Sequence, residues 1–189
     1  MSDVYDRLND DHVAFIKEQK MFFVATAPLS GDGSVNLSPK GYDSIALINA
    51  NRIAWIDLGG SGIETLAHVR ENGRMTLMFC AFAGAANILR LYGTATATSF
   101  GDAGFDKLME YFPDFDRART IFEMQITRVA DSCGWGVPFY EFQGERAQLR
   151  RWVDNKTTEE WREKRYQSNA MSLDGLPGLI RPDADKSEN

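Results

Sequence analysis

The stretch from Ser34 to Phe79 constrains the fold most, because short extended segments, a glycine loop and a helix follow one another there without a long connection. β-Branched and aromatic residues predict two strands on either side of Asn49-Ala50-Asn51. Asparagine tolerates a left-handed backbone and bonds its own main chain, so these three residues are expected to form a turn. The sequence therefore predicts two strands joined by a tight turn.

A glycine loop follows the second of these strands and leads into a helix. Glycines stand at positions 59, 60 and 62, Ser61 and Glu64 match an S-x-x-E capping box, and Asn72-Gly73 is a helix stop signal. Such a loop points free amide N–H groups and the positive end of the helix dipole at one spot, which suits a phosphate. The alternative is a plain strand-to-helix connection in which the glycines only permit a tight turn.

The segment Ser38-Pro39-Lys40-Gly41 lies one strand earlier and offers a hydroxyl and a cation within four residues. Both groups can bind a phosphate, so this segment favours the anion-site interpretation of the glycine loop. The competing interpretation makes Lys40 an ordinary solvated lysine in a turn.

Length and composition indicate one globular domain: 189 residues can bury a substantial core, and 43% hydrophobic with 25% charged residues is ordinary for this class. The net charge of −6 argues against nucleic-acid binding, which depends on neutralising phosphates. No apolar run reaches the ~20 residues of a membrane span, and the N-terminus has no secretory pattern, so we expect a cytoplasmic protein.

The chain has two cysteines, Cys80 and Cys133. Two are too few for a disulfide framework or for a metal site of the usual cysteine spacing, so neither a disulfide nor a metal is expected. Cys80 lies in the apolar run MTLMFCAF and is expected to be a small core residue.

The remaining pattern predicts strands at short spacing with a few inserted helices, which favours an antiparallel, closed or nearly closed β-barrel over a parallel sheet. Residues 1–180 are expected to form one domain with a helical extension from about 145, followed by a flexible tail over 181–189. Trp152 and Trp161 of the extension are expected to dock on the barrel or on a second subunit. The expected elements are a helix over 10–20 capped by Asn9 or Asp10, strands over 21–27 and 34–38 joined by a hairpin turn at 30–33, a central strand over 75–83, a long strand over 88–100, a helix over 102–112, a strand over 120–129, and helices over 145–153 and 158–167, the last entered through a capping box of Thr157 and Glu160.

The order and spacing of several segments resemble the pyridoxamine 5′-phosphate oxidase-like proteins of the FMN-binding split-barrel family. These segments are FFVATA, VNLSPKG, RIAWIDLGGSGIETLAHVRENGRMTLMF, ILRLYGTA, SCGWGVPFYEF and SLDGLPGL. The resemblance runs from about Leu8 to Leu179. It implies a mainly β, antiparallel split barrel with flanking helices, a homodimer, and one FMN in each of two clefts between the subunits.

The resemblance also implies positions for the flavin. The FMN phosphate is expected near a first group of residues, namely Asn36, Leu37, Ser38, Lys40, Gly62 and Thr65. Asp57 and Leu58 are expected along the flavin edge through their backbone groups. Arg90 is expected as a flavin contact, or else as an exposed arginine on the barrel wall. Trp135, between two glycines, is expected to cover the ring from the partner subunit, or else only to pack.

Two departures from pyridoxamine 5′-phosphate oxidase itself limit the functional expectation. That enzyme has Ser-Arg-Lys where this chain has Ile63-Glu64-Thr65, and a C-terminal arginine-histidine motif that is missing here. The only histidines are His12 and His68, and His68 is expected to be a surface or helix-packing residue. Pyridoxamine phosphate is therefore not the expected substrate.

Flavin carries the hydride chemistry itself, so the protein need only bind, orient and tune it. The sequence identifies no acid–base pair as catalytic, and the catalytic residues stay unknown. The leading expectation is an FMN-dependent oxidoreductase acting on an unidentified small molecule. The alternatives are a non-enzymatic protein that binds, stores or senses flavin, haem or a deazaflavin, and a dimeric structural barrel with an empty cleft.

Overall fold

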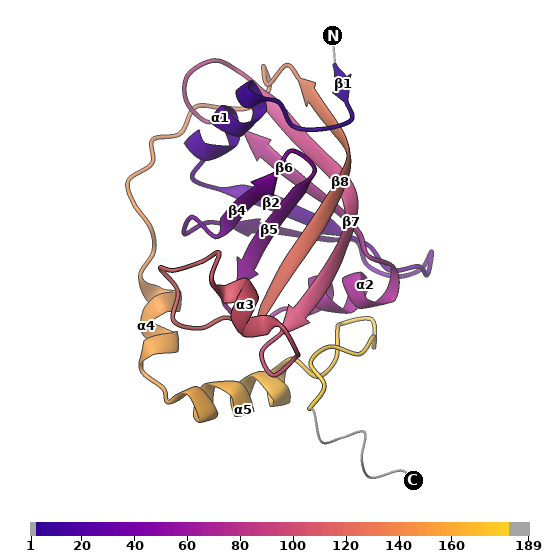
Figure 1. Cartoon of the computed structure of the whole chain (residues 1–189), viewed down its shortest axis with the longest axis vertical. Helices are drawn as coiled ribbons and strands as arrows, with labels where there is room; N and C mark the ends of the chain where they lie inside the picture. The colour runs from indigo at the N-terminus through magenta and orange to yellow at the C-terminus, as the bar shows by residue number, and fades with distance from the viewer. Residues whose placement is uncertain (1–2, 182–189) are drawn as a thin grey trace.

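A computed structural model of the chain describes residues 3–181, with eight strands and five helices among them (Figure 1). In chain order the elements are β1 (Val4–Tyr5), α1 (Asp10–Glu18), β2 (Phe22–Thr26), β3 (Asn36–Lys40), β4 (Ile45–Asn49), β5 (Arg52–Asp57), α2 (Glu64–Asn72), β6 (Arg74–Cys80), β7 (Ile88–Ser99), α3 (Phe105–Met109), β8 (Thr120–Ser132), α4 (Gln148–Asp154) and α5 (Thr158–Ser168).

One antiparallel sheet contains all the strands, in the order β3-β2-β6-β7-β8-β5-β4, with β1 added on β8. The sheet curls so strongly that its two ends approach each other: Lys40 of β3 lies with Nζ 5.1 Å from the ring centre of Trp55 on β5. We call the boundary between β3 and β5, which do not pair with each other, the seam. The expected antiparallel split barrel is confirmed.

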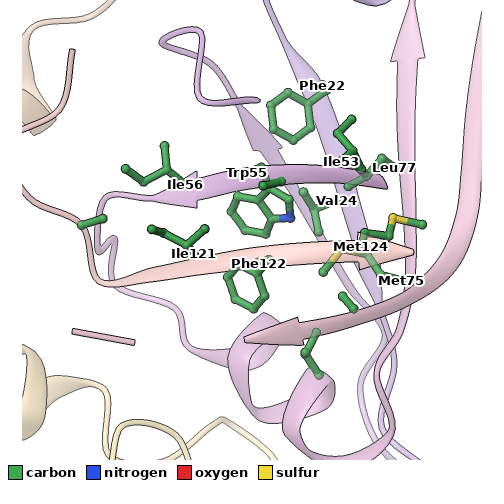
Figure 2. Packing of buried hydrophobic residues seen from close by; sticks show 14 of the residues in the cluster. Phe22, Val24, Ile53, Trp55, Ile56, Met75, Leu77, Ile121, Phe122 and Met124 are labelled. Atoms are coloured by element: carbon green, nitrogen blue, oxygen red, sulfur yellow. The ribbon is translucent and has the colours of Figure 1, made fainter. Parts of the chain in front are cut away.

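The barrel is filled by alternate side chains of its strands, as Figure 2 shows. Trp55 is completely buried and stacks on Phe122 with ring centres 4.4 Å apart, and Phe22 stacks on Phe79 at 5.6 Å. Burial of aromatic side chains of this size contributes about 2–3 kcal/mol each. The core therefore fixes the strands that position the seam.

Several local predictions are confirmed. Asn9 caps α1, and the capping box is closed by His12, whose ring Nδ1 accepts from the Asn9 amide. The Asn51 amide donates to Asn49 Oδ1 at 2.9 Å in the expected turn. The capping box of Thr157 and Glu160 opens α5.

The segment that follows β8 wraps around the outside of the barrel (Figure 1). A strap runs from the end of β8 along one side of the barrel to α4, and α5 crosses beneath it. Trp161 of α5 is buried against Phe100, with ring centres 5.2 Å apart, so the expected docking of this residue on the barrel is confirmed. Arg181 is held by Glu163, and the rest of the expected tail lies outside the described residues.

Several predicted element boundaries are wrong: the strand expected over 75–83 ends at Cys80, and the strand expected over 120–129 continues to Ser132. In β3 and α4 a distant residue competes for the backbone. Strand β3 begins at Asn36 rather than at 34, since the Ser34 amide and hydroxyl both donate to Asp174. It also extends to Lys40, which is therefore a strand residue and not a turn residue. Helix α4 begins at Gln148 rather than at 145, and Glu145 accepts from the Tyr42 amide instead.

Helix α3 covers five residues rather than the expected eleven over 102–112. Its start is delayed because Gly104 takes a left-handed conformation and Asp102 bonds the Ser99 amide. Phe105 and Phe112 are nevertheless buried, as an apolar helical face would require. The expected apolar contacts thus form through a short helix followed by turns.

The expected capping box of Ser61 and Glu64 is also wrong. Helix α2 begins at Glu64, so this residue stands at the first helical position and not at the third, and Ile63 occupies the cap without a side-chain bond. The Ser61 carbonyl is bound by Asn169, and Glu64 Oε1 accepts from the Leu173 amide at 3.3 Å. The N-terminus of α2 is left without a side-chain cap.

Candidate functional site

Strand β3 presents a row of polar side chains to the inside of the barrel at the seam. Asn36, Ser38 and Lys40 alternate along the strand with Leu37 and Pro39, which face outward and are exposed. The three inward residues pair in register with Thr26, Val24 and Phe22 of β2. Because β3 is the last strand of the sheet, the backbone groups of its free edge also face the seam.

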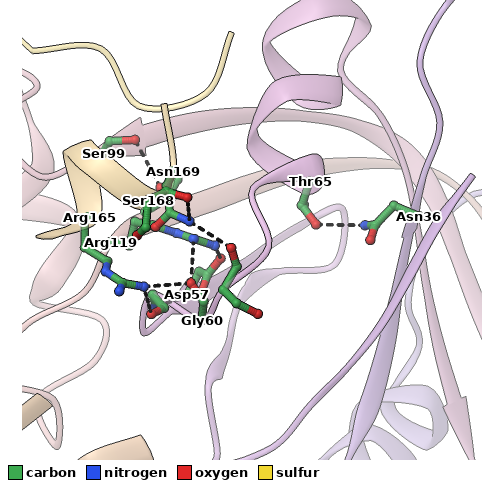
Figure 3. Close-up of polar contacts among 12 residues, drawn as sticks. Asn36, Asp57, Gly60, Thr65, Ser99, Arg119, Arg165, Ser168 and Asn169 are labelled. Atoms are coloured by element: carbon green, nitrogen blue, oxygen red, sulfur yellow. Dashed lines mark hydrogen bonds and ion pairs between the residues drawn. The ribbon is translucent and has the colours of Figure 1, made fainter. Parts of the chain in front are cut away.

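A chain of polar contacts connects β3 to α2 (Figure 3). Asn36 Nδ2 donates to Thr65 Oγ1 at 3.0 Å and to Thr26 Oγ1 at 3.2 Å. Thr26 Oγ1 in turn lies 3.0 Å from His68 Nδ1. The structure therefore brings two of the sequence-predicted residues, Asn36 and Thr65, into direct contact between β3 and α2.

His68 is fully buried on the barrel side of α2, as expected for a helix-packing histidine. Burial lowers the pKa of its imidazole, and the nearby carboxylates of Asp174, Glu64 and Glu71 oppose this only in part. The ring is therefore neutral at pH 7, and its Nδ1 can accept from Thr26. His68 Nε2 has no partner in the described part of the chain.

Ser38 and Lys40 follow Asn36 on the same face of β3, two and four residues further along the strand. The Ser38 hydroxyl is buried and has no hydrogen-bond partner among residues 3–181. Lys40 is half-buried over Trp55, and no carboxylate of the described chain forms a salt bridge with it. The interpretation of Lys40 as a solvated turn lysine is wrong, because the residue lies in a strand and packs on the core.

A buried ion pair between Asp57 and Arg119 contacts the glycine loop before α2 (Figure 3). Arg119 Nη2 lies 2.5 Å from Asp57 Oδ2, and both side chains are buried. Burial alone would raise the pKa of Asp57, but the charges of Arg119 and Lys40 and the Gly59 amide lower it to about 2. Asp57 is therefore ionised, and one carboxylate links β5, the loop and the start of β8.

Comparison with known proteins identifies the family. The family model for pyridoxamine 5′-phosphate oxidase matches residues 8–133. The chain belongs to the pyridoxamine 5′-phosphate oxidase family. It is 35% identical to the pyridoxamine 5′-phosphate oxidase family protein ustO of Aspergillus flavus over 202 residues, which cover 97% of this chain and 80% of that protein.

Solved structures of low identity share the fold. HupZ of Group A Streptococcus is 19% identical, with a TM-score of 0.52 over 65% of this chain and 91% of that chain. A candidate pyridoxamine 5′-phosphate oxidase from Lactobacillus delbrueckii is 17% identical, with a TM-score of 0.50 over 66% of this chain and 94% of that chain. These likenesses show the split-barrel architecture alone.

In this pyridoxamine 5′-phosphate oxidase family member, Asp57 and Leu58, the two residues predicted along the flavin edge, differ in how many of their polar groups are already hydrogen-bonded. The Asp57 carbonyl accepts from the Arg119 amide at 2.7 Å, and its carboxylate is bound by the same residue. Asp57 therefore supports the loop and does not present its carbonyl or carboxylate to a ligand. The backbone of Leu58, the next residue, has no partner among residues 3–181.

Arg90 and Trp135 are not brought to the seam by their own chain. Arg90 lies on the outward face of β7, where its Nη1 donates to Ser132 Oγ at 3.1 Å. Trp135 follows β8 and is 86% exposed, so packing within one chain does not explain it. Within residues 3–181, Arg90 and Trp135 therefore share no hydrogen bond or ion pair with the three inward residues of β3 or with Thr65.

Sequence reasoning missed the three residues that bind the glycine loop, namely Arg119, Arg165 and Asn169. One signal could have found two of them. Arg165 and Asn169 follow the buried Trp161 at intervals of four, so they share its helical face, which is unusual for a charged residue. Arg119 has no comparable signal.

Other potential sites were not found in the described chain. Residues 3–181 contain no group of three histidine, cysteine, aspartate or glutamate side chains placed to bind a metal. None of the helices there has the length and apolar character needed to cross a bilayer. Cys80 is buried and Cys133 exposed, and both are free thiols.

Proposed function

We propose that this family member binds FMN at the seam and uses it as an oxidoreductase on a small-molecule substrate. In the proposal the flavin phosphate lies between β3 and the start of α2, where Ser38, Lys40 and Gly62–Thr65 meet it. The supporting observation is that β3 carries a buried hydroxyl without a partner and a cation without a salt-bridged carboxylate within the described chain. Helix α2, which β3 contacts through Asn36 and Thr65, begins without a side-chain cap.

The chemistry of these groups fits a phosphate monoester. Such a group carries up to two negative charges, and the chain itself has a net charge of −6, so local positive groups must offset repulsion. Lys40, the Ser38 hydroxyl and the first amides of α2 supply a charge and several donors. Thr65 keeps its hydroxyl hydrogen, because its oxygen only accepts from Asn36.

Bound FMN would supply hydride transfer, and the protein would bind and orient it. The free edge of β3 offers backbone donors and acceptors for the polar edge of an isoalloxazine ring. The main chain of Leu58 is also unpaired in the described chain, but the residue is buried at 8% exposure. The barrel core behind Trp55 excludes water from that side. Neither histidine is exposed, so general acid–base chemistry by histidine is not part of the proposal.

The proposal includes a homodimer with the cofactor between subunits. Its support is that Arg90 and Trp135 face away from the seam of their own chain. The outward face of the sheet near Arg90 is apolar, since Phe23, Met78 and Pro39 lie in register with it. Pro39 is exposed and Phe23 and Met78 are partly exposed, and an apolar face of this kind suits a second copy of the chain.

Titration with FMN and riboflavin tests the phosphate site. We expect FMN to bind more tightly than riboflavin. Lys40→Met should raise the dissociation constant of FMN about ten-fold, as expected for the loss of one charge-assisted hydrogen bond, and should leave that of riboflavin unchanged. Methionine keeps the contact with Trp55, and Lys17→Met on the exposed face of α1 is the matched control. Equal loss of both ligands would refute the phosphate assignment.

Reduction of the bound flavin tests the oxidoreductase proposal. A yellow complex that is bleached anaerobically by NADH or NADPH and recovers its colour with an acceptor supports the enzyme. A yellow complex that stays oxidised with NADH and with NADPH under the same anaerobic conditions contradicts it and favours a protein that only binds flavin.

A further inference from the structure

The glycine loop between β5 and α2 is bound through three successive carbonyl groups, all from one side. Arg165 Nη1 donates to the Gly59 carbonyl at 2.7 Å and to the Gly60 carbonyl at 2.8 Å. Arg119 Nη1 also reaches the Gly60 carbonyl, at 3.1 Å, and Asn169 Nδ2 donates to the Ser61 carbonyl at 3.0 Å. We call Arg119, Arg165 and Asn169 the clamp.

The clamp determines where the amides of the loop point. The chain has no cis peptide bond in its described part, and in a trans peptide the N–H points opposite to the preceding C=O. The N–H groups of Gly60, Ser61 and Gly62 therefore point away from α5. Within residues 3–181 these three amides have no acceptor, and all three residues are partly or fully exposed.

The clamp also leaves a buried positive charge unbalanced. Arg119 and Arg165 are both buried, whereas Asp57 is the one carboxylate that binds them within the described residues. Burial lowers the pKa of Arg165 and the charge of Arg119 lowers it further, against the opposing charge of Asp57. The guanidinium of Arg165 is compensated by the two loop carbonyls and by the Trp152 ring, whose centre lies 4.6 Å from its central carbon, but by no carboxylate of its own in the described chain. A buried cation compensated in this way still lacks the counter-charge of an anion.

We propose that the clamp residues Arg165 and Asn169 are positioning residues for the flavin phosphate: they turn the Gly60–Gly62 amides outward as an anion cradle and place an excess positive charge behind it. This inference rests on the proposed function. The clamp does not touch the ligand; it acts through the loop. A bound phosphate would complete the charge balance that the protein leaves open.

The role of the clamp is specific for the phosphate and not for the ring. Its loss should therefore change the ratio of FMN to riboflavin affinity, whereas a merely structural role would weaken both ligands together. Asn169→Ala changes no charge and frees only the Ser61 carbonyl, so it tests the direction of the amides. Arg165→Met removes both carbonyl bonds and the charge, and Arg165→Lys restores the charge without the planar donor pair.

The experiment measures FMN and riboflavin dissociation constants by flavin fluorescence for the full chain and these three variants. We expect Arg165→Met to raise the dissociation constant of FMN about ten-fold or more and Asn169→Ala to raise it several-fold. Arg165→Lys should recover part of the affinity lost in Arg165→Met, and none of the three variants should change the dissociation constant of riboflavin. Arg162→Met removes a charge from the exposed face of the same helix and should change neither ligand.

Two outcomes overturn the inference. One is FMN binding that Arg165→Met and Asn169→Ala leave unchanged, and the other is an equal loss of FMN and riboflavin. If Arg165→Met does not fold, Asn169→Ala and Arg165→Lys decide between the same outcomes. If wild-type protein itself shows no preference for FMN over riboflavin, the proposed phosphate site fails, which is distinct from failure of the clamp.

Discussion

At the scale of single residues, Asp57 connects the fold to the site. Its folded pKa of about 2 lies below its ordinary value of 3.8, so the unfolded chain binds the proton more readily. The pair with Arg119 should thus contribute its full stability above about pH 4 and lose about 2 kcal/mol as the pH falls to about 2. Urea unfolding across this range measures the loss.

Asp57→Asn is the matching variant. It should remove that pH dependence and cost roughly 3–5 kcal/mol at neutral pH, because Arg119 stays buried without its partner. An equal acid loss in variant and wild type would show that other carboxylates are responsible.

The two histidines should make stability depend on pH in a higher pH range than Asp57 does. Burial lowers the pKa of His12 and of His68, against opposing carboxylates, so both are neutral in the fold and protonate more easily in the unfolded chain. Their stabilising effect is complete above the ordinary pKa of 6.5 and decreases as the pH falls below it. The melting temperature should drop between about pH 7 and pH 5, and a His12→Gln/His68→Gln variant should show a smaller drop; an equal drop would contradict this assignment.

At the scale of elements, Gly59 determines how closely α5 approaches the glycine loop. Its φ is +87°, and an added Cβ would lie 3.1 Å from Trp161 and 3.2 Å from Arg165. Gly59→Ala should therefore destabilise the protein by about 1–3 kcal/mol and increase hydrogen exchange in α5. Gly31→Ala, with nothing within 4 Å and an ordinary φ, is the control. Equal effects of the two changes would exclude a close approach as the cause.

The elements also show what the sequence could and could not predict. The long strand β7 and the asparagine turn at Asn51 follow from local patterns, and both were predicted correctly. The cap of α2 was not, because the Ser61 carbonyl and Glu64 bind residues more than 100 positions away. The clamp escaped prediction for the same reason. Asn36 and Thr65 could be placed near each other in advance only through family resemblance, since their contact joins two elements 29 positions apart in the sequence.

At the scale of the whole molecule, the proposed dimer depends on the outward face of β3 and its neighbours. Val35 and Leu37 are 76% and 61% exposed there. We expect light scattering at micromolar concentration to give the mass of two chains, and Leu37→Glu to shift it toward one because a buried charge is costly at an interface. FMN binding should weaken in the same variant. A wild-type monomer would contradict both the dimer and a cofactor site shared between subunits.

The central claim is that the seam and the glycine loop hold the phosphate of FMN. Amide chemical shifts of ¹⁵N-labelled protein test it most directly, because a hydrogen bond to phosphate changes the chemical shift of the donating amide proton. Saturation with FMN should shift the Gly60, Ser61, Gly62 and Thr65 amides downfield, whereas riboflavin at saturation should leave them near their free positions. Amides that do not respond to FMN, or that respond equally to riboflavin, would contradict the claim.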